Sequence, residues 1–264
     1  MLVLIKGAGD IASGIAARLH RSHIDIVMTD LPNPTSIRRT VCFSEAIRNG
    51  SATVEDITSV RADDAGDINR IIGEGNIAVI ADPECRIRET MSFDVEIDAV
   101  LAKRNLGTHI SDAPVVIAVG PGFIAGKDCH ACVETKRGHY LGSVIYHGSC
   151  IPNTGIPGNI GGYTEERVLM APCDGIMRPV KDIGDHVEAG ETVAYVGDEP
   201  IKSKITGVLR GLLPADTEVV IGMKSGDVDP RDIKEYCYSI SDKASAVGGG
   251  VLEALLSLTG ELKK

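Results

Sequence analysis

Residues 2–14 read LVLIKGAGDIASG, an apolar run followed by a glycine-rich turn. The run at 2–6 is typical of a buried strand, and residues 11–19 place apolar side chains on one helical face. This stretch therefore predicts a strand, a tight turn and a helix. The turn at 7–14 fits the dinucleotide-binding pattern GxGxxG/A, with Ala12 in the third small position.

The glycine turn also predicts an anion site. Gly9 would let a phosphate approach the backbone, and the start of the following helix would offer amide groups and a positive dipole end. An acid about twenty residues on, Asp30, follows a second predicted strand at 24–29 and could accept from ribose hydroxyls. The cofactor-binding candidates here are Gly7, Gly9, Asp10, Ala12, Ser13 and Asp30. Because the Asp10 carboxylate would repel a pyrophosphate unless it points away or caps the helix, a phosphorylated cofactor seated differently from NAD stays open. A turn that packs well and binds nothing is the alternative.

Further apolar runs extend the pattern along the chain. Strands are predicted at 77–81 and 115–119, and a helix at 93–104. Strands that alternate with helices indicate a parallel, doubly wound α/β sheet, so residues 1–165 are expected to form a Rossmann-like domain that binds a cofactor or nucleotide. After about Gly162, short β-like runs broken by Gly and Asp predict an all-β segment at 166–240. A C-terminal helix is expected within 241–264, beginning at Asp242 or, because glycine weakens a helix interior, only at Gly250.

Composition excludes several classes of function. The 264 residues carry 27 Lys and Arg against 37 Asp and Glu, a formal charge of −10, and contain no Trp and only three Phe. Nucleic acid is therefore a poor ligand, since binding it requires basic surface or aromatic stacking platforms. No apolar stretch is long enough to span a membrane, and the N-terminus lacks a signal-peptide pattern. Seven scattered cysteines favour reduced intracellular thiols, so we expect a cytoplasmic protein without membrane contact.

The densest polar cluster follows the predicted strand at 115–119, where open α/β sheets bind ligands. Gly120 and Gly122 are further cofactor-binding candidates in this cluster. His130 and Glu134 are four residues apart, so they share one face of a helix or one side of an extended chain and could act as an acid/base pair. The catalytic candidates are His130, Glu134, Arg137 and His139. The structural alternative is a hydrogen-bonded loop histidine, with Glu134 in a surface pair with Arg137.

Two other segments supply binding candidates. Arg38, beyond the second strand, could clamp a phosphate with its guanidinium fork, or could be a surface arginine paired with an acid. Asn153 and Thr154 begin a glycine-rich loop that would either cover a ligand with backbone amides or link domains. Cys129 and Cys132 form a CxxC pair without a second one, which favours two unrelated buried thiols over a zinc or redox site, and the metal content stays unknown.

Longer stretches resemble a known family. They are KGAGDIASGIAARLHRS at 6–22, LPNPTSIRRTVCFSEAIRNG at 31–50, GPGFIAGKDCHACVETKRGHYLG at 120–142, NTGIPGNIGGYTEERVLMAP at 153–172 and KEYCYSISDKASAVGGGVLEALL at 234–256. Together they resemble the YqeB family, which is associated with selenium-dependent molybdenum hydroxylases and whose N-terminal domain looks similar to the XdhC/CoxI maturation factors. The resemblance covers nearly the whole chain. No cysteine here maps onto an XdhC-type motif, which leaves direct transfer of sulfur or selenium in doubt.

The β segment resembles a small barrel-sandwich domain of the biotinyl/lipoyl type. Its lysines, Lys202 and Lys204, lie too close to Gly207 for the usual modified hairpin, so we expect neither lipoyl nor biotin and interpret the segment as a structural or docking module.

The resemblance implies an accessory or maturation factor for a molybdenum hydroxylase. It would bind a molybdopterin-type cofactor or a nucleotide such as NAD and deliver or modify the cofactor on the partner enzyme. The alternative is an NAD(P)-dependent oxidoreductase that uses the same crevice, and whether the chain is itself an enzyme stays open. The partners are then the small-molecule cofactor and the hydroxylase, and the oligomeric state, monomer or homo-oligomer, stays open.

Overall fold

The computed structural model describes residues 1–260 and divides the chain into two compact units. The first unit comprises Met1–Pro34, Cys42–Thr154 and Ile240–Lys264, of which residues 240–260 are described. The second comprises Thr35–Val41 and Gly155–Ser239. Neither unit is continuous in sequence. The predicted domain boundaries at 165 and 240 concern folding domains, and they stay predictions.

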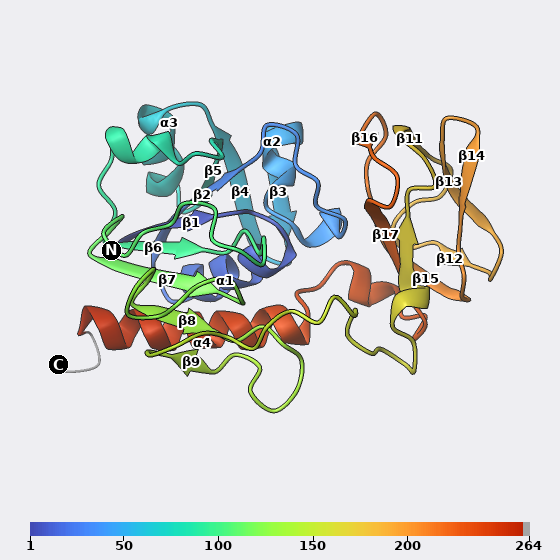
Figure 1. Cartoon of the computed structure of the whole chain (residues 1–264). Helices are drawn as coiled ribbons and strands as arrows, with labels where there is room; N and C mark the ends of the chain where they lie inside the picture. The colour runs from blue at the N-terminus through green and yellow to red at the C-terminus, as the bar shows by residue number, and fades with distance from the viewer. Residues whose placement is uncertain (261–264) are drawn as a thin grey trace. The chain divides into compact units, whose positions relative to one another are not determined.

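One nine-stranded sheet forms the centre of the first unit (Figure 1). Its strands are β1 (Leu2–Lys6), β2 (Asp25–Asp30), β3 (Ser51–Val54), β4 (Ile57–Ala62), β5 (Ile77–Ala81), β6 (Val95–Asp98), β7 (Val115–Val119), β8 (Ala131–Val133) and β9 (Val144–Ile145). The strand order is β3-β4-β5-β2-β1-β6-β7-β8-β9. The strands from β4 to β8 in this order are parallel, whereas β3 and β9 pair antiparallel at the two edges.

The prediction of a Rossmann-like, doubly wound sheet is wrong, because the observed sheet is mixed and helices do not alternate regularly with its strands. The connections from β5 to β6, from β6 to β7 and from β7 to β8 contain no α-helix. The helix expected at 93–104 is also wrong, since this segment contains β6. Val95 and Ile97 alternate with Glu96 and Asp98, and all four are buried, so the two-residue period of a strand prevails. The edge strand β3 and its neighbour β4 were not predicted.

The helices of the first unit are α1 (Asp10–His20), α2 (Glu45–Asn49), α3 (Ala65–Gly73) and α4 (Asp242–Thr259), with short 3-10 turns at η1 (Arg39–Val41) in the second unit and η2 (Arg86–Glu89) in the first. A buried cluster that includes Leu4, Val27 and Ile68 packs α3 on one face of the sheet. In Figure 1, α1 and α4 lie on the other side. None of the helices among the described residues has the length and apolar content needed to cross a membrane.

Helix α4 begins at Asp242 and continues through three consecutive glycines. The Ser241 hydroxyl caps it by accepting from the Ala244 amide at 3.2 Å. A Cβ at Gly248 would lie 3.0 Å from the Gly14 carbonyl of α1, and a Cβ at Gly250 only 2.0 Å from the Gly142 carbonyl. These glycines therefore let α4 approach its neighbours closely, which outweighs their poor helix propensity.

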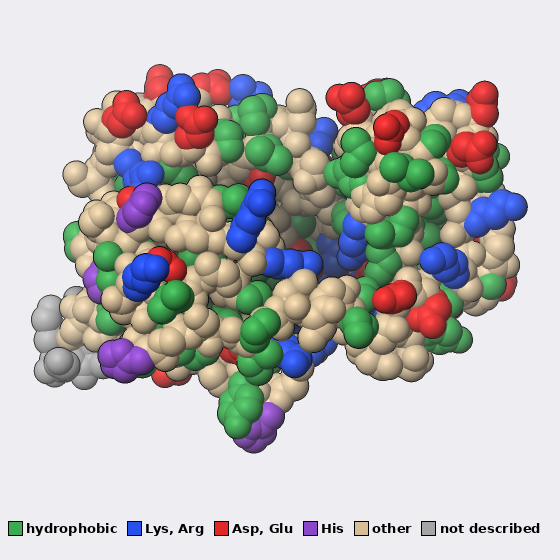
Figure 2. All heavy atoms as spheres, in the orientation of Figure 1, with side chains coloured by type: hydrophobic (Ala, Val, Ile, Leu, Met, Phe, Trp, Pro, Cys, Tyr) green, Lys and Arg blue, Asp and Glu red, His purple; other side chains and the backbone are tan. Residues whose placement is uncertain are grey.

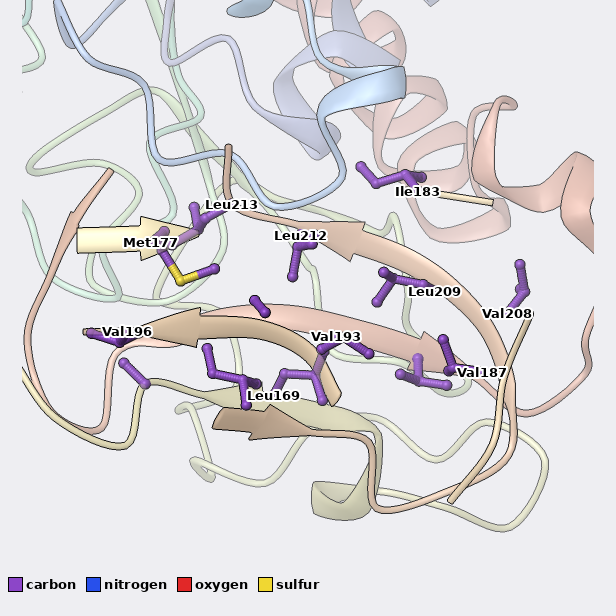
Figure 3. Packing of buried hydrophobic residues seen from close by; sticks show 14 of the residues in the cluster. Leu169, Met177, Ile183, Val187, Val193, Val196, Val208, Leu209, Leu212 and Leu213 are labelled. Atoms are coloured by element: carbon purple, nitrogen blue, oxygen red, sulfur yellow. The ribbon is translucent and has the colours of Figure 1, made fainter. Parts of the chain in front are cut away.

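The second unit contains two antiparallel four-stranded sheets, ordered β10-β17-β15-β12 and β14-β13-β11-β16. Their strands are β10 (Val168–Met170), β11 (Gly175–Pro179), β12 (His186–Val187), β13 (Thr192–Val196), β14 (Glu199–Lys202), β15 (Gly207–Leu212), β16 (Glu218–Val219) and β17 (Lys224–Asp229), accompanied by η3 (Glu165–Arg167) and η4 (Lys234–Cys237). One cluster of buried aliphatic residues from both sheets, including Met177, Val193 and Leu209, forms the core (Figure 3). The expected small barrel-sandwich domain is therefore not shown, and two antiparallel sheets take its place.

Candidate functional site

The candidate site lies along one edge of the nine-stranded sheet. Because β2, β1, β6, β7 and β8 are parallel neighbours in this order, the segments that follow them meet at the same edge. These segments carry the glycine turn after β1, Asp30 at the end of β2, Gly120 after β7 and Glu134 after β8. The structure thus brings together most of the candidates predicted in the first unit.

Hydrogen bonds from the neighbouring strand hold the glycine turn. The Gly7 amide donates to the Thr29 carbonyl at 2.8 Å, and the Ala8 amide donates to Asp30 Oδ2 at 2.8 Å. Gly7 has a φ of +93°, and a Cβ there would lie 3.0 Å from the Ala99 carbonyl oxygen. Glycine is therefore required here by backbone conformation and by the close approach of the chain after β6.

Asp30 and Ser13 hold this turn through hydrogen bonds to its backbone. Asp30 also accepts from the Leu31 amide at 2.7 Å, and burial raises the pKa of its carboxyl group. The fully buried Ser13 hydroxyl donates to the Ala8 carbonyl at 3.1 Å and accepts from the Phe43 amide at 2.8 Å. The structure therefore gives both residues a positioning role. Direct contact of either with a cofactor stays a prediction.

The N-terminus of α1 opens at this edge. Gly9, at the N-cap, is extended and has no side chain to cap the helix. Asp10 is in the first turn, and Ala12 is fully buried, which suits the close packing expected of the third small position. A helix start of this kind presents backbone amides and partial positive charge to an anion.

Gly120 and Gly122 follow β7 with φ values of +83° and +116°. A Cβ at Gly120 would lie 2.9 Å from Thr135 Oγ1, and one at Gly122 would lie 2.6 Å from the Arg104 Cα. Both glycines thus let neighbouring segments approach closely. Their contact with a cofactor stays a prediction.

Lys243, in the first turn of α4, is the residue that sequence reasoning missed. Burial lowers the pKa of its ammonium group, and the nearby charges of Arg137 and Lys103 act in the same direction, whereas those of Asp10 and Glu134 raise it. The side chain is therefore close enough to the start of α1 and to Glu134 to interact with both. A signal was present in the sequence, because a lysine in the first turn of a predicted helix opposes the helix dipole.

Glu134 is buried and holds two backbone segments together. Its Oε1 accepts from the Lys136 amide at 2.7 Å, and its Oε2 accepts from the Ile151 amide at 2.7 Å. Arg137 pairs instead with Asp242 through two hydrogen bonds of 2.7 and 3.0 Å. The surface pair between Glu134 and Arg137 considered from the sequence is therefore not the one that forms.

His130 and Glu134 are not brought together. His130 precedes β8 and Glu134 follows it, and four residues of extended chain separate side chains by roughly 13 Å. His130 Nδ1 accepts from the Val116 amide at 2.9 Å, which ties it to β7. His139 is exposed and makes an edge contact with the Tyr140 ring, with centroids 4.9 Å apart. Catalytic roles for these residues stay predictions.

The remaining candidates lie outside this group. Arg38 belongs to the second unit, where its guanidinium donates to the carbonyls of Tyr236 and Ser239 at 3.0 and 3.2 Å. Asn153 and Thr154 are exposed at the end of the middle segment of the first unit. Within residues 1–260, no three His, Cys, Asp or Glu side chains are grouped so that they could hold a metal ion.

A separate pocket of about 820 Å³ lies in the first unit where β4 and β5 end and α3 begins. One arginine, Arg86, lines this pocket together with five carboxylates. The carboxylates belong to Asp63, Asp64, Asp82, Glu84 and Glu89. Because these acids would repel a phosphate, this pocket is a poor place for a phosphorylated ligand.

Comparison with known proteins supports one relationship. The chain is 49% identical over 257 residues to "Uncharacterized protein YqeB" of Escherichia coli strain K12, an alignment that covers 97% of this chain and 48% of YqeB. The chain is thus similar to YqeB over most of its own length. The chain spans about half the length of this curated relative. No family model matches the chain.

Solved structures give only a weak likeness. An aspartoacylase family protein from Mesorhizobium loti and a succinylglutamate desuccinylase/aspartoacylase from Rhodobacter sphaeroides are each 14% identical, with TM-scores of 0.28. The ectoine utilization protein EutE (DoeB) from Ruegeria pomeroyi, solved with bound product, is 12% identical with a TM-score of 0.27. Each alignment covers 86% of this chain and 84% of the other. Likeness at this level supports no statement about fold or function.

Proposed function

We propose that this chain is an accessory protein for the maturation of a molybdenum hydroxylase, and that it binds a phosphorylated cofactor of the molybdopterin or nucleotide type. The binding site is the sheet edge that carries the glycine turn. The resemblance to the YqeB family supports the accessory role, and the chemistry of the edge supports the ligand class.

The observation that carries this proposal is the buried ammonium group of Lys243 beside the start of α1, in a chain whose net charge is −10. The charges of Arg137 and Lys103 act on Lys243 together with the carboxylates of Asp10 and Glu134, and Arg137 is paired with Asp242. In Figure 2, Lys and Arg side chains gather over the loops beyond β6 and β7. An anionic ligand at this edge would pair with the Lys243 ammonium group and accept hydrogen bonds from the directed amide groups of the helix N-terminus.

The residues at this edge suit both parts of such a cofactor. Backbone amides of α1 and the Lys243 ammonium group would hold the phosphate. Leu31 and Val100 follow β2 and β6, the two neighbours of β1, and each is 44% exposed, so they flank the glycine turn. Exposed aliphatic side chains on either side of a phosphate site provide apolar contact for a ring system.

Asp30 does not favour the dehydrogenase alternative. Both carboxylate oxygens of Asp30 accept backbone amides of the turn, at Ala8 and Leu31. The acid that should recognise the ribose of NAD is thus engaged in holding the loop, and NAD has no stronger support than another phosphorylated ligand.

Titration calorimetry with molybdopterin, CTP, ATP and NAD tests the proposed site. Lys243→Met should weaken binding of the preferred ligand by about 10- to 100-fold, the scale of one hydrogen bond to a charged group. Lys202→Met is the matched control, because Lys202 is exposed in the second unit. Wild-type affinity in a folded Lys243→Met protein would place the ligand elsewhere.

A further inference from the structure

Three buried cysteines form a thiol cluster beside the candidate site: Cys129, Cys132 and Cys150. The sulfur atoms of Cys129 and Cys132 are 3.4 Å apart, and the Cys132 thiol also interacts with that of Cys150. The surrounding residues are apolar and include Val116, Phe123 and Ala125. The two cysteines of the CxxC pair are therefore neighbours in space, contrary to the interpretation as unrelated thiols.

This thiol cluster is connected to Glu134 in three ways. Cys132 and Glu134 are two residues apart, Cys132 in β8 and Glu134 just after it, so their side chains lie on the same face of the sheet. Cys150 precedes Ile151, whose amide donates to Glu134 Oε2 at 2.7 Å. The charge of Glu134 also acts on the Cys150 thiol. A change in the sulfur contacts of Cys132 should therefore alter the backbone at Cys150 and Ile151, which Glu134 holds.

We propose that Cys129 and Cys132 form a reversible disulfide that loosens the contact between Glu134 and Ile151 and so regulates the anion site. The regulatory part rests on the proposed function, whereas formation of the bond does not. The two sulfur atoms must move from 3.4 Å to the bonding distance of about 2.05 Å. This movement shifts Cys132 toward Cys129 and changes its contact with the Cys150 thiol.

A small disulfide such as oxidised glutathione supplies the oxidising equivalents. One protein thiol loses its proton and attacks a sulfur of the small disulfide, which forms a mixed disulfide and releases one thiolate. The second protein thiol then loses its proton and attacks the mixed disulfide, and a second thiolate leaves. The two released thiolates take up the two protons, so the protein is oxidised by two electrons and the small disulfide is reduced to two thiols.

The exchange should be slow in the folded protein. Contact with the Cys129 thiol, together with burial, raises the pKa of Cys132 to about 12, and Cys129 and Cys132 are fully buried. A high pKa leaves little thiolate at neutral pH, so attack requires transient opening of the segment.

Peptide mass spectrometry tests whether the bond forms. The full chain is equilibrated with mixtures of reduced and oxidised glutathione under native conditions, alkylated and digested with trypsin. Peptide 128–136 contains Cys129 and Cys132 and no other cysteine, whereas Cys150 falls in peptide 138–167. We expect peptide 128–136 to become unalkylated and lighter by two hydrogens, in wild type and in Cys150→Ala alike. A peptide that stays doubly alkylated until urea is added, or a disulfide to another cysteine instead, would overturn the proposal.

Hydrogen exchange tests the coupling without any ligand. The Ile151 amide should exchange at least several-fold faster in the oxidised protein, and Cys132→Ala should abolish this response. Cys173→Ala is the control, because Cys173 is a half-buried thiol in the second unit. Unchanged exchange at Ile151 in fully oxidised protein would refute the regulatory step, whatever the outcome of the calorimetry on Lys243.

Discussion

Gly7 shows how a single residue shapes the candidate site. Its φ of +93° and its contact with Ala99 both exclude a side chain, whereas Gly75 has a φ of +80° and open space around it. Gly7→Ala should therefore lower the free energy of unfolding by about 2–4 kcal/mol, and Gly75→Ala by only about 1 kcal/mol, which isolates the steric part. Chemical denaturation of both variants measures the difference, and equal losses would contradict the required close approach.

The lowered pKa of Lys243 implies that anion binding at the site depends on pH. Because the folded pKa of this lysine is lowered, its charge is lost as pH rises through a value below the usual 10.5. Between that value and 10.5 the unfolded chain holds more protons, so the cost of burying the charged lysine falls and the protein becomes more stable as pH rises. Anion binding should weaken over the same window. Calorimetry between pH 7 and 10 should show this weakening in wild type, and a pH-independent affinity would contradict it. The expected dependence disappears in Lys243→Met.

His130 illustrates where sequence reasoning about the site ended. A spacing of four places His130 and Glu134 on one side of either a helix or a strand. In a helix the two side chains would be neighbours, whereas the observed strand puts them at opposite ends of β8. His130→Ala leaves the Val116 amide without its acceptor and should cost about 1–3 kcal/mol, whereas His130→Asn keeps an acceptor oxygen and should cost less. Thermal unfolding ranks the two variants. Equal stability of both would show that this hydrogen bond contributes little.

At the scale of elements, the three glycines of α4 act differently. Gly250 faces the Gly142 carbonyl, where a Cβ would lie at 2.0 Å, whereas Gly249 has nothing within 4 Å. Gly249→Ala should stabilise the protein by about 0.5–1 kcal/mol through helix propensity. Gly250→Ala should destabilise it, because the helix must move away from that carbonyl. Denaturant titration of the pair checks the opposite signs, and two stabilising substitutions would refute the close packing.

Elements whose pattern is local could be predicted, and others could not. Apolar runs at 2–6, 77–81 and 115–119 coincide with β1, β5 and β7, and the run predicted at 24–29 overlaps β2. The strand β6 was not predicted, because Glu96 and Asp98 are polar and gave this segment the pattern of a helix with one polar face, although both are buried. Glu96 is compensated by an ion pair with Arg88 at 3.0 Å, and Asp98 Oδ2 accepts from Thr108 at 2.6 Å. These partners lie eight and ten residues away along the chain, in segments outside the strand, so the local pattern at 93–104 does not reveal them.

At the scale of the whole molecule, the order of strands and the division into units lay beyond the sequence. Each unit is assembled from separate stretches of chain, and Thr35–Val41 belongs to the unit that otherwise begins at Gly155. Arg38 was expected near the glycine turn because it follows β2, but long-range contacts assign it to the other unit. The group of Lys243, Arg137 and Lys103 was missed for the same reason, since it joins three segments distant in sequence.

Native mass spectrometry of the whole chain tests the central claim most directly. The purified protein is offered molybdopterin, CTP, ATP and NAD in separate samples, with the Lys243→Met and Lys202→Met variants alongside. The proposed function predicts that wild type and Lys202→Met retain a molybdopterin or nucleotide species, and that Lys243→Met loses it. Failure of the wild-type chain to retain any of these phosphorylated ligands, or retention by Lys243→Met equal to that of wild type, would contradict a cofactor site at the glycine turn.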